Sequence, residues 1–200
     1  MTVIAAARTK KHGIVIASDS EVSWWAHKDN GGTKLAVMGE DNQWIAGLAG
    51  GARDAQVFEH FVDWPQFAAD TLYKGNVEKW AVRELVPRLQ QAAIEHGILS
   101  GGEHVGLPLE FMGAFILATE DTLMVIDGGF YVHVPPQGRF AVGSGANEAF
   151  GHLGDRGPWT KSDVIGAARA ARVTAHGVGG PVWVVDTKDK TIEMLEEEED

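Results

Sequence analysis

Thr2 is the residue whose position in the chain most directly suggests chemistry. A small residue after Met1 permits removal of the initiator methionine, which leaves Thr2 as the first residue. Such a threonine combines a hydroxyl that attacks a carbonyl carbon with an α-amino group that accepts the hydroxyl proton. Free α-amino groups have pKa values of about 7.7–8.0, so a modest decrease makes one a base at neutral pH. Many chains begin Met-Thr without this consequence, so the position alone does not decide the matter.

Other common catalytic and binding motifs are missing from the sequence. Gly143-Ser144-Gly145 lacks the outer glycines of a nucleophile elbow, because Val142 and Ala146 stand in their places. No glycine-rich phosphate-binding motif follows an expected strand. The chain has no cysteine, which excludes disulfides and thiol nucleophiles. Its eight histidines show no metal-ligand spacing, so we expect neither a metal nor a cofactor.

Composition predicts one globular domain, residues 1–195, followed by an acidic tail, residues 196–200. The 200 residues are 44% hydrophobic and 22% charged, close to globular averages. The net charge of −11 disfavours nucleic-acid and membrane-surface binding, both of which need clustered Lys and Arg. The N-terminus has no basic region of the kind that opens a signal peptide, and the longest apolar stretch, Phe111–Ala118, is too short to span a membrane. We therefore expect a cytoplasmic protein.

The chain before Gly50-Gly51 has the pattern of short antiparallel strands joined by turns, and after these glycines it changes to a helical period. A long loop, Ser20–Thr33, separates two expected strand pairs. Pro65 ends the first helical pattern, which includes Val57 and Phe61, and Pro87 should interrupt the second. The four expected strands are Thr2–Ala7, Ile14–Ala17, Lys34–Met38 and Gln43–Leu48, and the second helical pattern runs from Val77 to Ile94.

The second half repeats this order after a glycine-rich loop, Gly97–Glu110. Ser162 is the expected N-cap of the last helix, which Gly177 ends. Two sheets covered by helices on both outer sides would bury every apolar face in this order of elements. The remaining elements are strands at Phe111–Thr119, Leu123–Ile126, Phe130–Val134 and Phe140–Val142, a helix at Ala146–Leu153, and a hairpin of Val182–Val185 with Thr191–Leu195.

Five short motifs, in this order, resemble the proteasome β-subunit and bacterial HslV-like peptidase family. The resemblance covers nearly the whole chain and is strongest from Ile45 to Phe61. It implies the α+β fold of N-terminal nucleophile hydrolases, a four-layer αββα sandwich with two antiparallel sheets. The motifs are Thr2–Ala5, Gly13–Ser20, Lys34–Val37, Ile45–Asp54 and Val142–Gly145.

The resemblance also implies a set of site residues. Thr2 takes the place of the nucleophile, and Lys34 that of a lysine whose charge lowers the pKa of the threonine amine. Asp19 matches the aspartate that pairs with this lysine. Ser144 matches a serine that assists proton movement near the amine.

The remaining implied residues surround the substrate. The backbone N–H of Gly50 matches an oxyanion donor, worth about 3–4 kcal/mol of the reaction barrier. Leu48 and Ala49 would line the pocket for the substrate residue before the scissile bond, which favours an apolar residue there. We interpret Asp54 as a helix-starting residue favoured by the helix dipole.

Taken together, the resemblance implies a self-compartmentalising threonine endopeptidase that hydrolyses polypeptides through an acyl-enzyme. It implies homo-oligomeric stacked rings and a separate ATP-dependent unfoldase. The chain itself has no nucleotide-binding motif, so any ATP hydrolysis would belong to that partner.

Two departures from the family pattern keep alternatives open. Thr174 stands where the family has an aspartate that supports the threonine and the serine, and a threonine carries no negative charge. Trp24-Trp25 has no counterpart and is either a subunit contact or a cover for the core. The alternatives are an inactive ring-forming or regulatory homologue, an N-terminal nucleophile amidase acting on small amides, and, more remotely, a binding module of unrelated fold.

Overall fold

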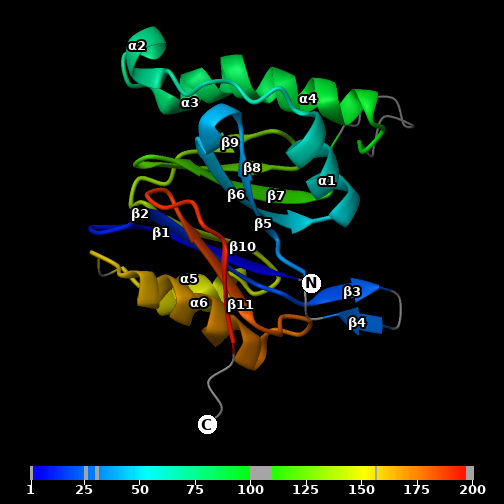
Figure 1. Cartoon of the computed structure of the whole chain (residues 1–200), viewed down its shortest axis with the longest axis vertical. Helices are drawn as coiled ribbons and strands as arrows, with labels where there is room; N and C mark the ends of the chain where they lie inside the picture. The colour runs from blue at the N-terminus through cyan, green and yellow to red at the C-terminus, as the bar shows by residue number, and fades with distance from the viewer. Residues whose placement is uncertain (1, 25–26, 30–31, 100–109, 156, 197–200) are drawn as a thin grey trace.

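Two five-stranded antiparallel sheets lie face to face at the centre of the molecule (Figure 1). The computed structural model describes residues 2–24, 27–29, 32–99, 110–155 and 157–196. The first sheet has the order β10 (Arg139–Gly143), β1 (Val3–Thr9), β2 (Gly13–Asp19), β11 (Val182–Asp186) and β12 (Glu193–Leu195). The second has the order β5 (Leu35–Met38), β6 (Trp44–Gly50), β7 (Gly113–Thr119), β8 (Thr122–Asp127) and β9 (Val132–His133).

Alternating residues of β1 explain why it lies at the centre of the sandwich. Val3 and Ala5 face one apolar cluster on the helix side, whereas Ile4 and Ala6 face another between the sheets. All four side chains are fully buried. Because successive side chains of a strand point to opposite faces, a strand buried on both faces needs apolar residues at every position.

Helices cover the outer face of each sheet, which completes four layers (Figure 1). The expected αββα sandwich is therefore confirmed. The helices α5 (Ala146–Leu153) and α6 (Lys161–Thr174) pack on the first sheet. On the second sheet lie α1 (Ala52–Phe61), α2 (Ala69–Tyr73), α3 (Val77–Trp80), the π-helical turn η2 (Ala81–Leu85) and α4 (Val86–Glu95).

The N-cap of α6 differs from the sequence prediction. Thr160 caps the helix, since its hydroxyl oxygen accepts a hydrogen bond from the Asp163 backbone N–H at 3.2 Å. The Asp163 carboxylate in return accepts one from the Thr160 N–H at 2.7 Å, which completes a capping box. Ser162, the predicted cap, is wrong because it lies inside the first turn, only one residue before Asp163.

The segment Ser20–Thr33 is not wholly a loop. It contains a short antiparallel hairpin of β3 (Val22–Trp24) and β4 (His27–Asp29), which forms a small sheet of its own. The prediction that Trp24-Trp25 covers the core or contacts another subunit concerns side chains that lie outside the described residues.

Pro87 coincides with a change in the hydrogen-bond pattern of the helices that cover the second sheet, but it does not interrupt them. It lies in the first turn of α4, directly after the π-helical turn η2. Proline has no N–H to donate to the carbonyl four residues before it, so the regular pattern changes at this point. The helical segments nevertheless follow one another without a loop, and Trp80, Leu85 and Leu89 are all buried in the same cluster.

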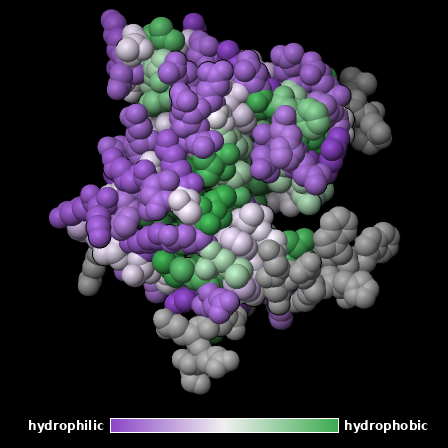
Figure 2. Space-filling model, viewed as in Figure 1, coloured by the Kyte–Doolittle hydropathy of each residue, from purple (hydrophilic) through white to green (hydrophobic). Residues whose placement is uncertain are grey.

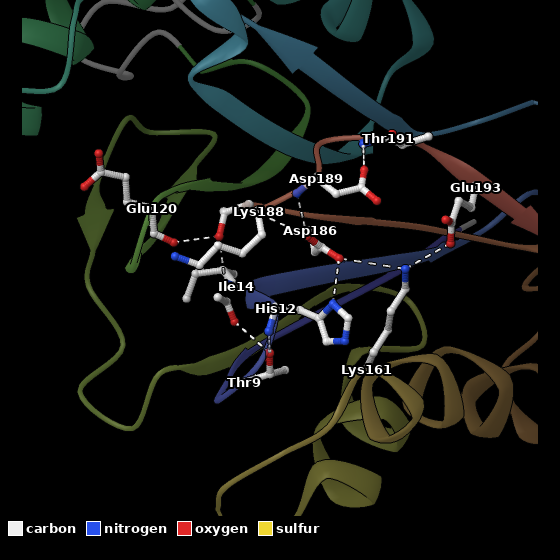
Figure 3. Close-up of polar contacts among 12 residues, drawn as sticks. Thr9, His12, Ile14, Glu120, Lys161, Asp186, Lys188, Asp189, Thr191 and Glu193 are labelled. Carbon is white, nitrogen blue, oxygen red and sulfur yellow. Dashed lines mark hydrogen bonds and ion pairs between the residues drawn. The ribbon is translucent and has the colours of Figure 1, made fainter.

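Polar contacts tie the layers together at the end of β1 and β2 opposite to Thr2 (Figure 3). The buried Asp186 carboxylate lies 3.1 Å from His12 Nδ1 and 3.8 Å from Lys161 Nζ. The Thr187 hydroxyl accepts a hydrogen bond from Ile14 N–H at 3.0 Å and donates one to the carbonyl of Glu120 at 2.7 Å. This last contact joins the two sheets.

Most of the face seen in the space-filling view is hydrophilic, and apolar residues are visible mainly in its middle (Figure 2). Among the described residues, no helix combines the length and the apolar character needed to cross a bilayer.

Candidate active site

Thr2 opens into a cavity of about 420 Å³ at the N-terminal edge of the sandwich. In Figure 1 this edge lies where β1 starts, next to β3 and the beginning of β5. Lys34, Leu48 and Gly50 line the cavity together with Thr2. Four of the sequence-predicted site residues, from three separate segments of the chain, therefore share one space.

Three contacts with the turn between β10 and α5 hold the main chain of Thr2. The Thr2 backbone nitrogen donates a hydrogen bond to Ser144 Oγ at 3.2 Å. The Thr2 carbonyl accepts hydrogen bonds from the Ser144 hydroxyl at 3.3 Å and from the Gly145 N–H at 3.2 Å. Ser144 therefore lies directly beside the nitrogen that would become the α-amino group after removal of Met1.

Gly143 allows the main chain of Thr2 to lie this close to Ser144. Its φ of +94° is a conformation that L residues rarely adopt, and a Cβ at this position would collide with the Thr2 carbonyl group. Backbone atoms cannot rotate out of the way as a side chain can, so a larger residue would push Thr2 away from Ser144.

Gly143→Ala is expected to destabilise the fold by at least about 1–3 kcal/mol, because the backbone conformation alone carries that cost for a non-glycine residue. The measurement is the free energy of unfolding in a denaturant titration. Gly151→Ala is the matched control, since Gly151 lies in α5 with no atom within 4 Å of an added Cβ. It should be neutral or stabilising by up to about 1 kcal/mol. Equal stability of the two variants would contradict the steric argument.

Asp19 joins Lys34 to the N-terminal segment. Its Oδ1 accepts hydrogen bonds from Lys34 Nζ at 2.6 Å and from Val3 N–H at 2.9 Å. Its Oδ2 accepts from the N–H groups of Glu21, at 3.2 Å, and Gly179, at 3.3 Å. Four donors compensate a fully buried carboxylate, and one oxygen is shared between the ammonium and the residue after Thr2. Lys34 Nζ is thereby held close to the chain start.

The ammonium of Lys34 is buried, with only 10% of the side chain exposed. Burial disfavours the charged form and lowers the pKa of Lys34 below its ordinary value, while the charges of Asp19 and Glu21 oppose this decrease. The charges of Asp19 and Glu21 therefore favour the ammonium form of Lys34, and burial opposes it. A cation beside an amine disfavours protonation of that amine.

Gly50 stands at the end of β6 with its N–H directed toward the cavity side. The N–H of Leu48 donates to the carbonyl of Lys34, and the N–H of Gly51 donates to Met112 on the opposite side of the strand. Backbone N–H groups alternate sides along a strand, so the Gly50 N–H points the same way as that of Leu48. It lies beyond the start of β5, on the side where Lys34 lies. This is a suitable orientation for an oxyanion donor.

Leu48 and Ala49 face opposite sides of β6. Leu48 lines the cavity. It also lines a second, small pocket of about 60 Å³, together with Phe58 and Phe115. Ala49 instead lies in the cluster between the sheets. Because neighbouring side chains of a strand alternate, only one of this pair can reach the cleft, and a substrate-pocket role remains a prediction for Leu48.

Glu21 and Glu59 also line the cavity, although sequence reasoning did not select them. Glu21 is buried, and an added Cβ at Gly179 would lie 2.7 Å from its Oε2. The signal that could have identified Glu21 is its place two residues after Asp19, at the end of a strand that leads into the site. Thr174, by contrast, is exposed at the last position of α6.

The described residues contain no group of three or more His, Asp or Glu side chains arranged to hold a metal ion.

The two antiparallel sheets between helical layers are those of the N-terminal nucleophile hydrolase fold. Solved structures with this arrangement include BPH of Thiobacillus denitrificans, with a TM-score of 0.65 and 19% identity over 94% of this chain and 99% of that one. The same protein in complex with epoxomicin matches with a TM-score of 0.64 and 17% identity over 98% of this chain and 100% of the other.

A second similar protein is the eukaryotic HslV from Trypanosoma brucei, with a TM-score of 0.58 and 20% identity over 92% of this chain and 99% of that one. No family model matches the chain. These comparisons, at low sequence identity, show the fold, and they extend over nearly all of this chain and of its neighbours.

Proposed function

We propose that the chain is a threonine endopeptidase in which Thr2, freed by removal of Met1, is the nucleophile. The observation that carries this proposal is that Thr2, Gly50 and Lys34, whose ammonium is bound by the buried Asp19, line one cavity. The fold shared with HslV, and with the Thiobacillus denitrificans protein that binds epoxomicin, supports it.

Thr2 supplies both the nucleophile and the base in the proposed acylation. Thr2 Oγ1 attacks the substrate carbonyl carbon while the α-amino group takes the hydroxyl proton. The negative charge on the carbonyl oxygen is stabilised by the Gly50 N–H. Collapse of this intermediate breaks the C–N bond, and the α-ammonium returns the proton to the leaving amine, which leaves an ester on Thr2. Water then attacks the ester with the α-amino group again as base, which releases the acid and restores Thr2.

Lys34 and Ser144 act on this amine in different ways in the proposed mechanism. The Lys34 ammonium disfavours protonation of the α-amine and lowers the pKa of that amine toward neutral pH. Ser144 Oγ lies 3.2 Å from the nitrogen and passes protons between the amine and the reacting atoms. Asp19 holds the Lys34 side chain in place in this mechanism.

The proposal extends to assembly and location through the resemblance in sequence. We place the chain in homo-oligomeric stacked rings in the cytoplasm, with polypeptide substrates delivered by an ATP-dependent unfoldase. Sedimentation of the full chain tests the assembly directly, since a monomer at micromolar concentration would contradict it.

Epoxomicin provides the decisive test of the site. It is an epoxyketone, whose two electrophilic carbons suit a hydroxyl and an amine on one residue. Intact mass should first show loss of Met1 and then a gain of one epoxomicin per chain. Thr2→Ala should show no gain, and a version with Met1 retained should behave in the same way. Labelling of Thr2→Ala to the wild-type level would refute the assignment of Thr2.

An inactive homologue is the second candidate, and the exposed Thr174 favours it, because α6 supplies no carboxylate at that position. The same mass measurement separates the two. Permanent retention of Met1 in the protein purified from its own cells would leave no free threonine amine and would favour the inactive homologue.

A further inference from the structure

Asp54 lies beneath the turn that carries the expected oxyanion donor. It is a buried residue in the first turn of α1, and its Oδ2 accepts a hydrogen bond from the backbone N–H of Met112 at 3.0 Å. The carbonyl of the same residue, Met112, accepts a hydrogen bond from the Gly51 N–H at 3.1 Å. Two hydrogen bonds therefore connect Asp54 to Gly51, the residue after Gly50. One joins the Asp54 carboxylate to the Met112 N–H, and the other joins the Met112 carbonyl to the Gly51 N–H.

The same residues are also in close steric contact with one another. An ideal Cβ on Gly51 would lie 3.2 Å from Asp54 Cγ and Oδ2, so the carboxylate packs directly against the Gly51 backbone. A Cβ on Gly50 would collide with the Met112 carbonyl. Both glycines are therefore enclosed, Gly51 by the Asp54 side chain and Gly50 by the strand segment that Asp54 binds.

We propose that Asp54 is a positioning residue that fixes the direction of the Gly50 N–H through Met112 and Gly51. This inference rests on the proposed peptidase function. Glycines have wide backbone freedom, and two in succession would let the donor rotate away from a developing oxyanion. Oxyanion donors act only when they are held in place before the reaction, since reorientation during the reaction would consume the stabilisation.

Burial of the Asp54 carboxylate disfavours its charged form, which the Met112 N–H stabilises. Burial raises the pKa of Asp54, and the hydrogen bond from Met112 opposes this increase. A charged acceptor makes a hydrogen bond about twice as strong as a neutral one. The carboxylate therefore makes a stronger hydrogen bond with the Met112 N–H than an amide would. An amide of the same shape would cost less free energy to bury.

The test compares Asp54→Asn with Asp54→Ala in kinetics on a peptide amide substrate. Asp54→Asn keeps an oxygen acceptor and should fold at least as stably as the wild type, with kcat about threefold lower. Asp54→Ala removes the acceptor and should lower kcat by about 30-fold, less than the loss of 10²–10³ on removal of a donor. KM should stay within about twofold in both. Asp63→Asn, at a 95% exposed side chain just after α1, is the control and should leave kcat unchanged.

Gly51→Ala provides an independent measurement on the same path. In the wild-type background the Cβ added at position 51 presses on the Asp54 carboxylate, so Gly51→Ala should lower kcat. In the Asp54→Ala background that carboxylate is absent, and Gly51→Ala should lower kcat by a factor at least threefold smaller. Strict additivity would overturn the proposal, as would wild-type kcat in Asp54→Ala. This comparison remains informative if Asp54→Ala folds poorly, because Asp54→Ser, which also removes the group that contacts the Gly51 Cβ, can replace it as the second background. Normal turnover by Thr2→Ala would instead overturn the proposed function, so the two failures are distinct.

Discussion

Thr2→Ala is expected to abolish peptide hydrolysis, lowering kcat by about 10⁴-fold or more. The substitution removes the attacking oxygen and leaves the α-amine, so no covalent intermediate can form. The fold should persist, because Ser144 and Gly145 bind the backbone nitrogen and carbonyl of Thr2, which alanine retains. The measurement is turnover of a fluorogenic peptide, with the N-terminal mass determined on every sample.

Thr2→Ser is the matched variant, because it preserves a hydroxyl on the same carbon. It should keep turnover within about tenfold of the wild type, while Thr2→Ala stays at background. Equal turnover by the wild type and Thr2→Ala, with Met1 removed from both, would exclude Thr2 from the mechanism and leave only the fold assignment.

The layered fold could be predicted from the sequence because it follows from local patterns. The short apolar runs of β1 and β2 and the change of period after Gly50-Gly51 depend on residues close together in the chain. The resemblance in motif order then gave the αββα arrangement. The hairpin β3–β4 could not be predicted in this way, since three-residue strands are too short to show a pattern.

The N-cap of α6 shows a different limit of local reasoning. Ser162 and Thr160 are both capping residue types, so residue type alone favours neither. The choice depends on Asp163, which can reach back to the N–H of Thr160 only if Thr160 is the cap. Recognition of the pair as a capping box would have placed the helix start correctly.

The candidate site is predictable only in part because its contacts join distant residues. Asp19 and Lys34 were placed together by resemblance, and no periodicity in the segment between them could have done so. The position of Asp54 in the sequence indicates only a helix start, yet its hydrogen-bond partner is Met112, 58 residues further on. The sequence pattern places Glu21 in a loop, but the turn after β2 brings it into the cavity. Each of these contacts depends on the packing of segments that are far apart in the sequence.

Lys34→Met is expected to lower kcat by about 10²–10³-fold and also to destabilise the fold. The loss of activity follows because the buried ammonium no longer lowers the pKa of the α-amine or stabilises negative charge in the cavity. The loss of stability, about 3–5 kcal/mol, follows because Asp19 is left buried without its cation. Peptide turnover measures the first effect and denaturant unfolding the second.

A second substitution separates these two effects. In the Lys34→Met background, Asp19→Asn should raise the free energy of unfolding, because it removes the uncompensated charge and keeps an acceptor for some of the backbone N–H groups. It should not restore turnover, since the cation is still missing. Recovery of activity by the double variant would show that Lys34 acts on stability alone.

The pH dependence of the wild type tests the charge of Lys34 directly. Because burial lowers the pKa of Lys34 in the folded protein, turnover should fall on the alkaline side at a pH below 10.5. In the same window the unfolded chain binds the proton more tightly than the folded protein, so stability should rise with pH while activity declines. Lys34→Arg keeps its charge throughout this range and should lack the alkaline decline, even if its planar head lowers the maximum rate. An unchanged alkaline limb in Lys34→Arg would mean that another group controls the decline.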